Sequence, residues 1–424
     1  MREMKDSGVE WIGEIPKDWK TNKISSVYEN RSTKVSDKDY QPLSVTKKGI
    51  VPQLETAAKT NNGDNRKLIK KNDFVINSRS DRRGSCGISN YDGSCSLINT
   101  VIKPRINMCN IYYSFVFRSE LFSDEFYKCG NGIVDDLWST KWSNMKNIYI
   151  PFPRLDVQHR IADYLDTKCS KIDTIIAREQ AVIEKLKEYK LSVITEAVTK
   201  GLNPNVPMKD SGIEWIGEIP EHWNIGKTSY FFEIQLGKML QPKQINITET
   251  LENYLCAINL GNNCLKFEPI KQMWFSAKDK KIFSIKKGDM LVVEGGDVAS
   301  SDIVSIEVKN LYFQNALHRV REKGLVDIKI LRYLLMLAKG IGHIDLICNK
   351  ATIAHFPKEK FMNLECVLLP KKEQQQIVNY LDNKCTKIES AIEKKQAVIN
   401  KLTEYKKSII YEVVTGKKEV LQHE

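Results

Sequence analysis

The stretch QHRIADYLDTKCSKIDTIIAREQAVIEKLKEYKLSVITEAVT, residues 158–199, decides the fold of this chain. It contains neither Pro nor Gly, and its apolar residues recur at steps of three and four, from Ile161 and Leu165 to Val193. That period is typical of one apolar stripe along a long helix. The sequence therefore predicts a helix of about 40 residues, or about 60 Å at 1.5 Å per residue.

The same helix returns 216 positions later as QQQIVNYLDNKCTKIESAIEKKQAVINKLTEYKKSIIYEVVT, residues 374–415, with about 23 of 40 positions identical from Ile161 onward. A second repeat pairs KDSGVEWIGEIPKDW, residues 5–19, with KDSGIEWIGEIPEHW, residues 209–223, and agrees at 12 of 15 positions. We call these two segments the clasps, and interpret each as a packed loop, not a regular element, that seats a domain. A period above 200 residues is too long for a solenoid and indicates two large copies of one module.

The repeats divide the chain into α+β domains and long helices. We predict a first domain over residues 1–153 with its clasp at 5–19, a helix over 154–200, a linker over 201–208, a second domain over 209–370 with its clasp at 209–223, a second helix over 371–416, and a tail over 417–424. Within the first domain, residues 68–78, 94–104 and 147–153 have the short apolar runs of strands, and residues 111–128 are typical of a helix. A pseudo-twofold axis relating the modules would pack the helices as an antiparallel coiled coil.

The interiors of the two domains align but diverge. LIKKNDFVI, residues 68–76, corresponds to SIKKGDMLV, residues 284–292, which matches Asp73 with Asp289; Asn99 then matches Asn315. The offset grows by 12 residues between the clasps and these segments, so an insertion is expected between about positions 224 and 284. The duplicated helices and clasps indicate that the chain holds the same partner twice. The diverged domains indicate that each recognises a different target.

Composition favours a polyanionic partner. The formal net charge is +12 with a pI near 9.0, in a chain whose 42% hydrophobic content is that of a folded globular protein. Ten cysteines form no C-x-x-C pair, which argues against a zinc site, and neither a signal peptide nor an apolar run of membrane-spanning length is present. We expect a cytoplasmic protein with free thiols and no membrane contact.

Catalytic groupings are weak in this sequence. Asp302, Glu307 and Lys309 have the spacing of a metal-dependent nuclease, but Glu307 and Lys309 are also consistent with the outward face of a strand. We therefore expect no catalytic residue and no metal site. An enzyme that cuts DNA with Mg²⁺ through these three residues stays open as an alternative, as does a non-enzymatic coiled-coil scaffold.

Basic and amide side chains gather instead in loops. Arg is suited to guanine and phosphate, and Asn and Gln are suited to adenine. The candidate DNA-binding residues are Arg79, Arg82 and Arg83 in the first domain, and Lys238, Gln241, Lys243, Gln244, Asn315, His318, Arg319 and Arg321 in the second.

The doubled SG(V/I)EWIGEIPxxW clasp and the doubled helix resemble the specificity (S) subunit of Type I restriction-modification systems. The segments LGKMLQPK, GDMLVVEGG and QNALHRVR also resemble one class of target recognition domain. The resemblance implies two target recognition domains, each reading one half of an asymmetric bipartite site in double-stranded DNA, separated by the helices as a spacer.

The resemblance also implies partners and cofactors. Two methyltransferase subunits would carry S-adenosylmethionine, and restriction (motor-nuclease) subunits, where present, would use ATP and Mg²⁺; this chain would hold no cofactor. The clasps are expected to contribute to partner binding through Trp11, Ile12, Trp19, Trp215, Ile216 and Trp223. If the helices set the spacer, adding or removing a helical turn near residues 197–202 should change the spacer and leave the half-sites unchanged.

Overall fold

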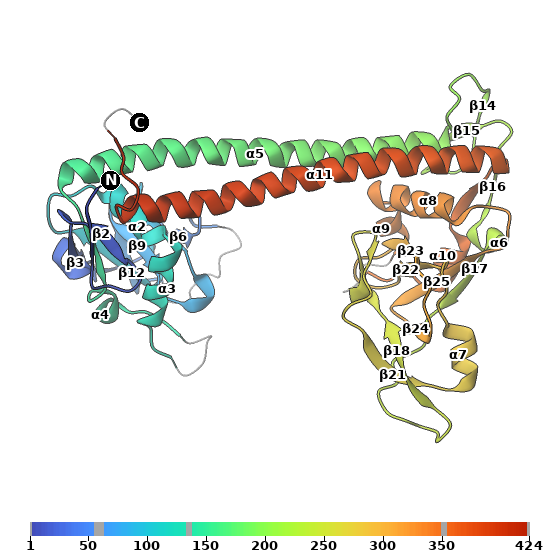
Figure 1. Cartoon of the computed structure of the whole chain (residues 1–424), viewed down its shortest axis with the longest axis horizontal. Helices are drawn as coiled ribbons and strands as arrows, with labels where there is room; N and C mark the ends of the chain where they lie inside the picture. Colours follow the sequence, from blue (N-terminus) through green and yellow to red (C-terminus); the bar gives the residue numbers. More distant parts are fainter. Residues whose placement is uncertain (1, 55–62, 133–137, 349–353, 422–424) are drawn as a thin grey trace. The chain divides into compact units, whose positions relative to one another are not determined.

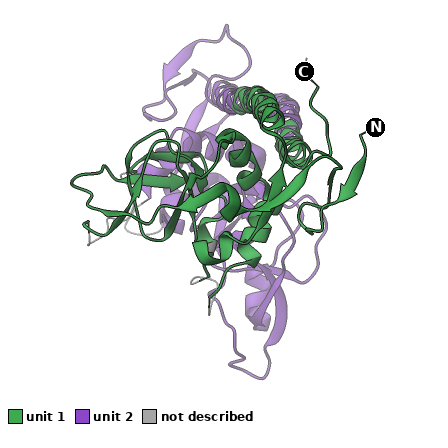
Figure 2. Cartoon of the chain, turned by 90° about the vertical axis from the view of Figure 1, so that its left-hand side faces the viewer, with its two compact units in different colours: residues 1–180, 396–424 green, residues 181–395 purple. Residues whose placement is uncertain are grey.

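The computed structural model describes residues 2–54, 63–132, 138–348 and 354–421. It confirms the mixed α+β class, with two β-rich regions and two long helices that pack together (Figure 1). The chain forms two units, unit 1 comprising Met1–Gln180 with Gln396–Glu424 and unit 2 comprising Ala181–Lys395 (Figure 2). No helix within the described ranges has the length and apolar character needed to cross a membrane.

The two long helices are α5, Leu155–Thr199, and α11, Lys371–Val414, and each continues from one unit into the other. In unit 1, Lys406 of α11 donates to Asp173 of α5 at 2.6 Å, while Ile409 and Val413, further along α11, share a core with the earlier Ile161 and Leu165 of α5. The two helices therefore run antiparallel, as predicted. The repeated Cys169 and Cys385 lie in different units as free, buried thiols.

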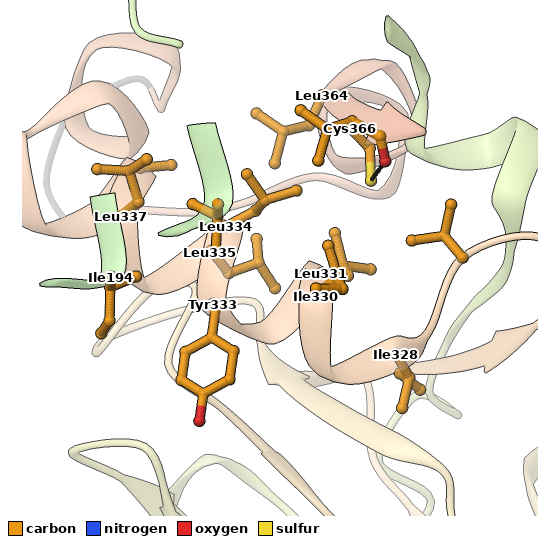
Figure 3. Packing of buried hydrophobic residues seen from close by; sticks show 14 of the residues in the cluster. Ile194, Ile328, Ile330, Leu331, Tyr333, Leu334, Leu335, Leu337, Leu364 and Cys366 are labelled. Atoms are coloured by element: carbon orange, nitrogen blue, oxygen red, sulfur yellow. Dashed lines mark hydrogen bonds between the residues drawn. The ribbon is translucent and has the colours of Figure 1, made fainter. Parts of the chain in front are cut away.

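In unit 2 the same pairing involves the other halves of the helices. Lys190 of α5 donates to Glu389 of α11 at 2.5 Å, and Val198 shares a core with Leu381. That core is dominated by α8, Ile328–Gly340, which is buried on nearly every side (Figure 3). Its Tyr333 hydroxyl and Lys329 ammonium both donate to Asp382 of α11 at 2.6 Å, so the domain is held to the helix by polar as well as apolar contacts.

Each unit contains a four-stranded antiparallel sheet of the same order. In unit 1 the order is β10 (Cys86–Ile88), β9 (Phe74–Asn77), β12 (Asn99–Pro104), β4 (Tyr28–Asn30), and in unit 2 it is β23 (Ser301–Ile303), β22 (Met290–Val293), β25 (Leu317–Glu322), β17 (Phe232–Leu236). The clasp-side pairs β3–β13 (Lys20–Lys23, Tyr149–Phe152) and β16–β26 (Asn224–Lys227, Glu365–Leu368) also correspond. The internal repeat therefore extends through the diverged domains.

A second layer of strands differs more between the units. Unit 1 has β11–β8–β5 (Gly93–Cys95, Arg66–Ile69, Lys34–Val35) and the hairpin β6–β7 (Leu43–Thr46, Gly49–Pro52), whereas unit 2 has β21–β18–β24 (Lys271–Phe275, Thr250–Leu255, Leu311–Phe313) and the small hairpin β19–β20 (Leu260–Gly261, Cys264–Leu265). The segment between β17 and β22, residues 237–289, is longer than the segment between β4 and β9, residues 31–73, and this is where the sequence places the insertion.

Two predictions from the sequence are corrected by the structure, the first of them by strand register. Asn99 pairs with Asn77, but Leu317 pairs with Val293, the counterpart of Asn77, so two further residues precede β25 and Asn99 does not match Asn315. The helix predicted over residues 111–128 is two helices, α2 (Asn110–Arg118) and α3 (Glu120–Lys128), because Ser119 has extended backbone and its hydroxyl caps α3 by accepting from Phe122 N. A side-chain cap of this kind begins a new helix where periodicity alone suggests continuity.

The clasps are hairpins, which corrects their interpretation as irregular loops. Strand β1 (Met4–Asp6) pairs with β2 (Glu14–Pro16), and β14 (Met208–Asp210) pairs with β15 (Glu218–Pro220). The repeated DSG sequence forms the same turn twice, since the Asp6 and Asp210 carboxylates each accept from the second following backbone N–H at 2.9 Å.

Each clasp seats against the end of one long helix. Trp11, Ile12 and Trp19 are buried with Val413 and Val414 of α11. Ile216 and Trp223 are buried with Val193, Ile194, Ala197 and Val198 of α5, and Trp215 is partly buried beside them. These side chains therefore hold the clasps to the helices, and their contact with a partner subunit stays a prediction.

The two clasp tryptophans offer a matched test of one hydrogen bond. Trp223 Nε1 donates to Glu373 Oε2 at 2.9 Å, whereas the buried Trp19 Nε1 has no acceptor. We expect Trp223→Phe to lower the free energy of unfolding by about 1.5–3 kcal/mol more than Trp19→Phe, because only the former removes a bond to a charged group. Urea unfolding followed by circular dichroism measures both, and equal costs would contradict the assignment.

Candidate nucleic-acid interface

One carboxylate–arginine clamp supports the loops of each domain. In unit 1, Asp73 receives two bonds from Arg31, at 2.6 and 3.0 Å, and one from the Lys70 backbone. In unit 2, Asp289 receives two from Arg321, at 2.6 and 2.8 Å, and one from the Lys286 backbone. The repeated Asp is thus kept while its Arg partner comes from a different strand. Arg321, a candidate DNA contact, is engaged in this internal pair.

Two further candidates are buried. His318 is fully buried, and its Nε2 donates to the Phe356 carbonyl at 2.7 Å. Arg319 is 3% exposed and donates to the carbonyls of Ile282 and Ser284 and to Glu233. As neighbours on β25, the two side chains point to opposite faces of the sheet, His318 toward Phe361 and Arg319 toward Ser284. Both are buried, so we place them outside the candidate interface.

His318 makes unit 2 sensitive to acid. Burial lowers its pKa, and its Nδ1 has no hydrogen-bond partner. The unfolded chain binds a proton below about pH 6.5 that the folded chain resists, so stability present above that pH is lost as the pH falls. Between pH 7.5 and 5.5 we expect a loss of about 1 kcal/mol that His318→Gln removes. Urea unfolding at both pH values tests this, and His355→Gln, at an exposed histidine, should leave the loss in place.

The arginine loop of unit 1 lies at the surface. It follows β9 and includes a short 3₁₀ turn, Ser80–Arg82. Arg82 is the most exposed of its arginines and lies 3.4 Å from Asp81, while Arg83 pairs with Asp124 and lies over the Tyr127 ring. Arg79 is half-exposed, and its Nε lies 3.6 Å from Asp81 Oδ1. The structure thus brings Arg79, Arg82 and Arg83 together, with Arg82 the most accessible.

A recess of about 600 Å³ opens beside Arg79. Lys67 lies half-buried within it, donates to the Asn99 carbonyl at 2.6 Å and has its pKa lowered by burial. None of the residues that line the recess is acidic; they are Asn30, Lys67, Ser78, Arg79, Leu97, Ile98, Thr100, Ser139, Lys141, Trp142 and Ser143. Lys67, Arg79 and Lys141 give the recess a cationic lining suited to a phosphate, and the Asp81 carboxylate that pairs with Arg79 lies outside that lining.

The same place in unit 2 has a different charge. The bridge between Arg79 and Ser139 has its counterpart between Gly295 and His355. There the His355 ring lies 3.1 Å from Glu294, whose position corresponds to Ser78. The two domains therefore share a backbone framework but present different chemistry at one equivalent location.

Of its remaining candidates, unit 2 presents all but Asn315 on one loop, Gly237–Glu249, between β17 and β18. Lys238 is largely buried, and its ammonium donates to Asp279 at 2.6 Å. The Asn315 backbone donates to the Lys238 carbonyl at 2.9 Å, so these two residues lie together. Gln241 is partly exposed, and Lys243 and Gln244 are exposed. Sequence reasoning missed the apolar residues of this loop, and the cationic recess in unit 1, since no local pattern distinguishes an exposed Ile or Lys from a packed one.

The three residues of the nuclease alternative differ in position, because only Asp302 lies on a strand. Asp302 accepts from the Leu265 backbone at 2.9 Å and pairs with Arg332 at 3.3 Å. Glu307 and Lys309 lie in the loop after β23, not on the outward face of a strand as predicted, because β23 ends at Ile303. In the described ranges, no three His, Cys, Asp or Glu side chains are grouped so that they could hold a metal ion.

The fold is thus that of a two-domain protein in which β-rich domains with basic surface loops are combined with paired long helices. Residues 16–185 match the model of the Type I restriction modification DNA specificity domain. The chain is 25% identical over 288 residues to the Type I restriction enzyme MjaVIII specificity subunit of Methanocaldococcus jannaschii, covering 64% of this chain and 62% of the relative. It is 26% identical over 246 residues to the putative MjaX specificity subunit of the same organism, covering 52% and 55%. The chain is thus similar to specificity (S) subunits of Type I restriction-modification systems, and the family model covers residues 16–185.

Solved structures share the fold. A chain from a structural study of complex assembly and conformational transition of the type I R-M system superposes with a TM-score of 0.71 at 14% identity, covering 95% of this chain and 99% of that one. The crystal structure of the HsdS subunit from Thermoanaerobacter tengcongensis gives 0.50 at 14% identity, covering 95% and 98%. Both likenesses concern the fold alone, and the matches to the two curated relatives span less than two thirds of their length.

Proposed function

We propose that this chain is the DNA specificity subunit of a Type I restriction-modification complex, and that it binds an asymmetric, bipartite sequence in double-stranded DNA. One observation carries the proposal. The two domains repeat one sheet order and one Asp–Arg clamp, yet the loops at equivalent positions differ in charge and shape. A shared frame with different surfaces is what reading two different half-sites requires.

The cationic surfaces support DNA as the ligand. In unit 1 the arginine loop and the recess place Arg79, Arg82, Lys67 and Lys141 within one region. Phosphate contacts of this kind position a protein on the duplex, and base contacts add the specificity. The net charge of +12 predicts that affinity falls steeply as salt concentration rises.

The internal repeat supports two copies of one partner. Each clasp packs on the end of one long helix through corresponding Trp and Ile side chains, so the chain carries the same clasp–helix arrangement twice. We propose that two methyltransferase subunits bind there, carrying the S-adenosylmethionine, and that restriction subunits join where they are present. The chain itself supplies recognition and no catalytic residue.

Methylation mapping tests the proposal. The chain is co-expressed with a methyltransferase subunit of a Type I system, and the methylated positions are read across the host genome. We expect one gapped motif with two unlike halves. Methylation at an ungapped or palindromic motif, or none above the level of the methyltransferase alone, would argue against it.

Incubation of the purified chain with DNA and Mg²⁺ separates the alternatives. Cleavage without partners that Asp302→Ala removes would favour the nuclease. Failure to retain any duplex at low salt, with the partners still bound, would favour the scaffold.

A further inference from the structure

The loop Gly237–Glu249 in unit 2 displays apolar side chains to solvent. Met239 is 77% exposed, Leu240 54%, Ile245 73% and Ile247 95%. Single exposed apolar residues are ordinary, but four within nine positions of one loop form a patch that needs an explanation.

The loop is held in place by one carboxylate. Glu249 is 7% exposed, and its Oε2 accepts from Ile245 N at 2.8 Å, Asn246 N at 3.2 Å and Gln241 Nε2 at 2.8 Å. These bonds lower the pKa of Glu249. The Gln244 amide donates to the Glu249 carbonyl at 3.2 Å. The backbone N–H groups of Ile245 and Asn246 therefore turn inward, while the apolar side chains of the loop are exposed beside Lys243.

The surroundings of the loop are cationic. Trp274 N of β21 donates to the Gln241 carbonyl at 3.1 Å, which joins the loop to β21 and to α7, Ala277–Phe283. The neighbouring acids are neutralised, because Asp279 pairs with Lys238 and Glu252 with Lys280. Exposed lysines in these segments are Lys243, Lys271, Lys278 and Lys281. An apolar patch bordered by cations is complementary to DNA, whose stacked bases lie behind phosphates.

The corresponding segment of unit 1, which the structure describes in full, lacks such a patch. The corresponding segment between β4 and β6 is RSTKVSDKDYQP, residues 31–42, which is mostly polar and contains no Ile, Leu or Met. The apolar loop therefore belongs to one domain and falls within the region where the sequence carries its insertion.

We propose that Met239, Leu240, Ile245 and Ile247 form a wedge that enters the base stack of duplex DNA at the half-site read by unit 2. This inference rests on the proposed DNA recognition. Insertion of apolar side chains between base pairs unstacks them, and sequences with easily unstacked steps then bind more tightly. The wedge thus adds specificity at one half-site that amide contacts alone do not supply.

Fluorescence of 2-aminopurine tests the wedge, because the base brightens when it is unstacked. Duplexes carry the gapped motif defined by methylation mapping, with 2-aminopurine at successive positions of one half-site or the other except the methylated positions, because methyltransferases flip their target base out of the stack. With the full chain and its methyltransferase partners, we expect brightening at a step in the half-site of unit 2. Leu240→Ser with Ile247→Ser should remove that signal and weaken binding by about tenfold or more.

Two further variants separate the wedge from loss of folding. Leu325→Ser changes an apolar residue of unit 2 that is 53% exposed outside this loop, and should leave signal and affinity unchanged. Glu249→Gln keeps every apolar side chain but weakens the bonds that order the loop, so it should reduce the signal in part.

The contrary outcomes are distinct. If the wild-type complex discriminates its motif from scrambled duplexes but no position in the half-site of unit 2 brightens, the wedge is refuted and the proposed function stands. If the serine variant loses methyltransferase co-purification while its DNA signal is intact, the patch binds a protein partner instead. If the wild-type complex shows no sequence preference, the proposed function itself fails.

Discussion

Arg82→Ala with Arg83→Ala is expected to abolish recognition of the half-site read by unit 1 and to leave the other half-site recognised. Both side chains lie on the exposed loop after β9, and Arg82 is 67% exposed with only a 3.4 Å contact to Asp81 to displace. Loss of two base or phosphate contacts at about 1–3 kcal/mol each corresponds to a loss of affinity of at least about 30-fold. Arg83 also anchors the loop to Asp124 of α3, so the single variant Arg82→Ala isolates the direct contact.

The measurement uses duplexes in which one half-site is scrambled. The wild-type complex should lose affinity when either half is scrambled, whereas the double variant should lose affinity only when the half-site of unit 2 is scrambled. Arg105→Ala with Arg154→Ala removes the same charge from other surface positions of unit 1 and should keep both dependences. Equal sensitivity of the double variant to both halves would refute the assignment of this loop.

A matched insertion in the two long helices is expected to lengthen the spacer and leave both half-sites unchanged. The insertion site expected from the sequence, residues 197–202, lies in the core of unit 2, so the insertion is placed elsewhere in the helices. An insertion near residues 197–202 falls among Ala197 and Val198, which pack against Trp223 in the core of unit 2, and should damage that unit. Insertion of four residues between Gln180 and Ala181 of α5, and again between Lys395 and Gln396 of α11, lies where each helix leaves one unit for the other.

Four residues add about 6 Å and about 40° of rotation to a helix. One base pair of B-DNA adds about 3.4 Å and about 35°. Since the rotation must match for both domains to face the duplex, we expect the mapped motif to gain one base pair between unchanged halves. Insertion in α5 alone should instead shift the pairing of Asp173 with Lys406 and of Lys190 with Glu389, and lower stability. A motif whose halves change, or whose spacer does not, would show that the helices do not set the spacing.

Local sequence patterns predict much of the fold. Apolar residues at helical spacing predict α5 and α11. The apolar stripe on so long a helix must be buried, which predicts that the two copies pack against each other. The repeat also predicts two related domains, since residues that keep one packing arrangement vary little. Where prediction failed at this level, a single side chain changed the local outcome, as when Ser119 caps α3 and ends the longer helix predicted over residues 111–128.

What the sequence by itself determined is the repeated architecture, and through its motifs the resemblance to Type I specificity subunits. The tertiary structure alone decided which polar residues face outward. His318 and Arg319, like Gln244 and Arg82, have side chains that could contact DNA, but the pairing of β25 between β17 and β22 buries them. The burial of a strand residue depends on register with segments far away in the chain. The exposure of the apolar loop is also decided by tertiary structure. Glu249 accepts from the amides of Gln241 and Ile245, and the Ile, Leu and Met side chains of the loop are left exposed.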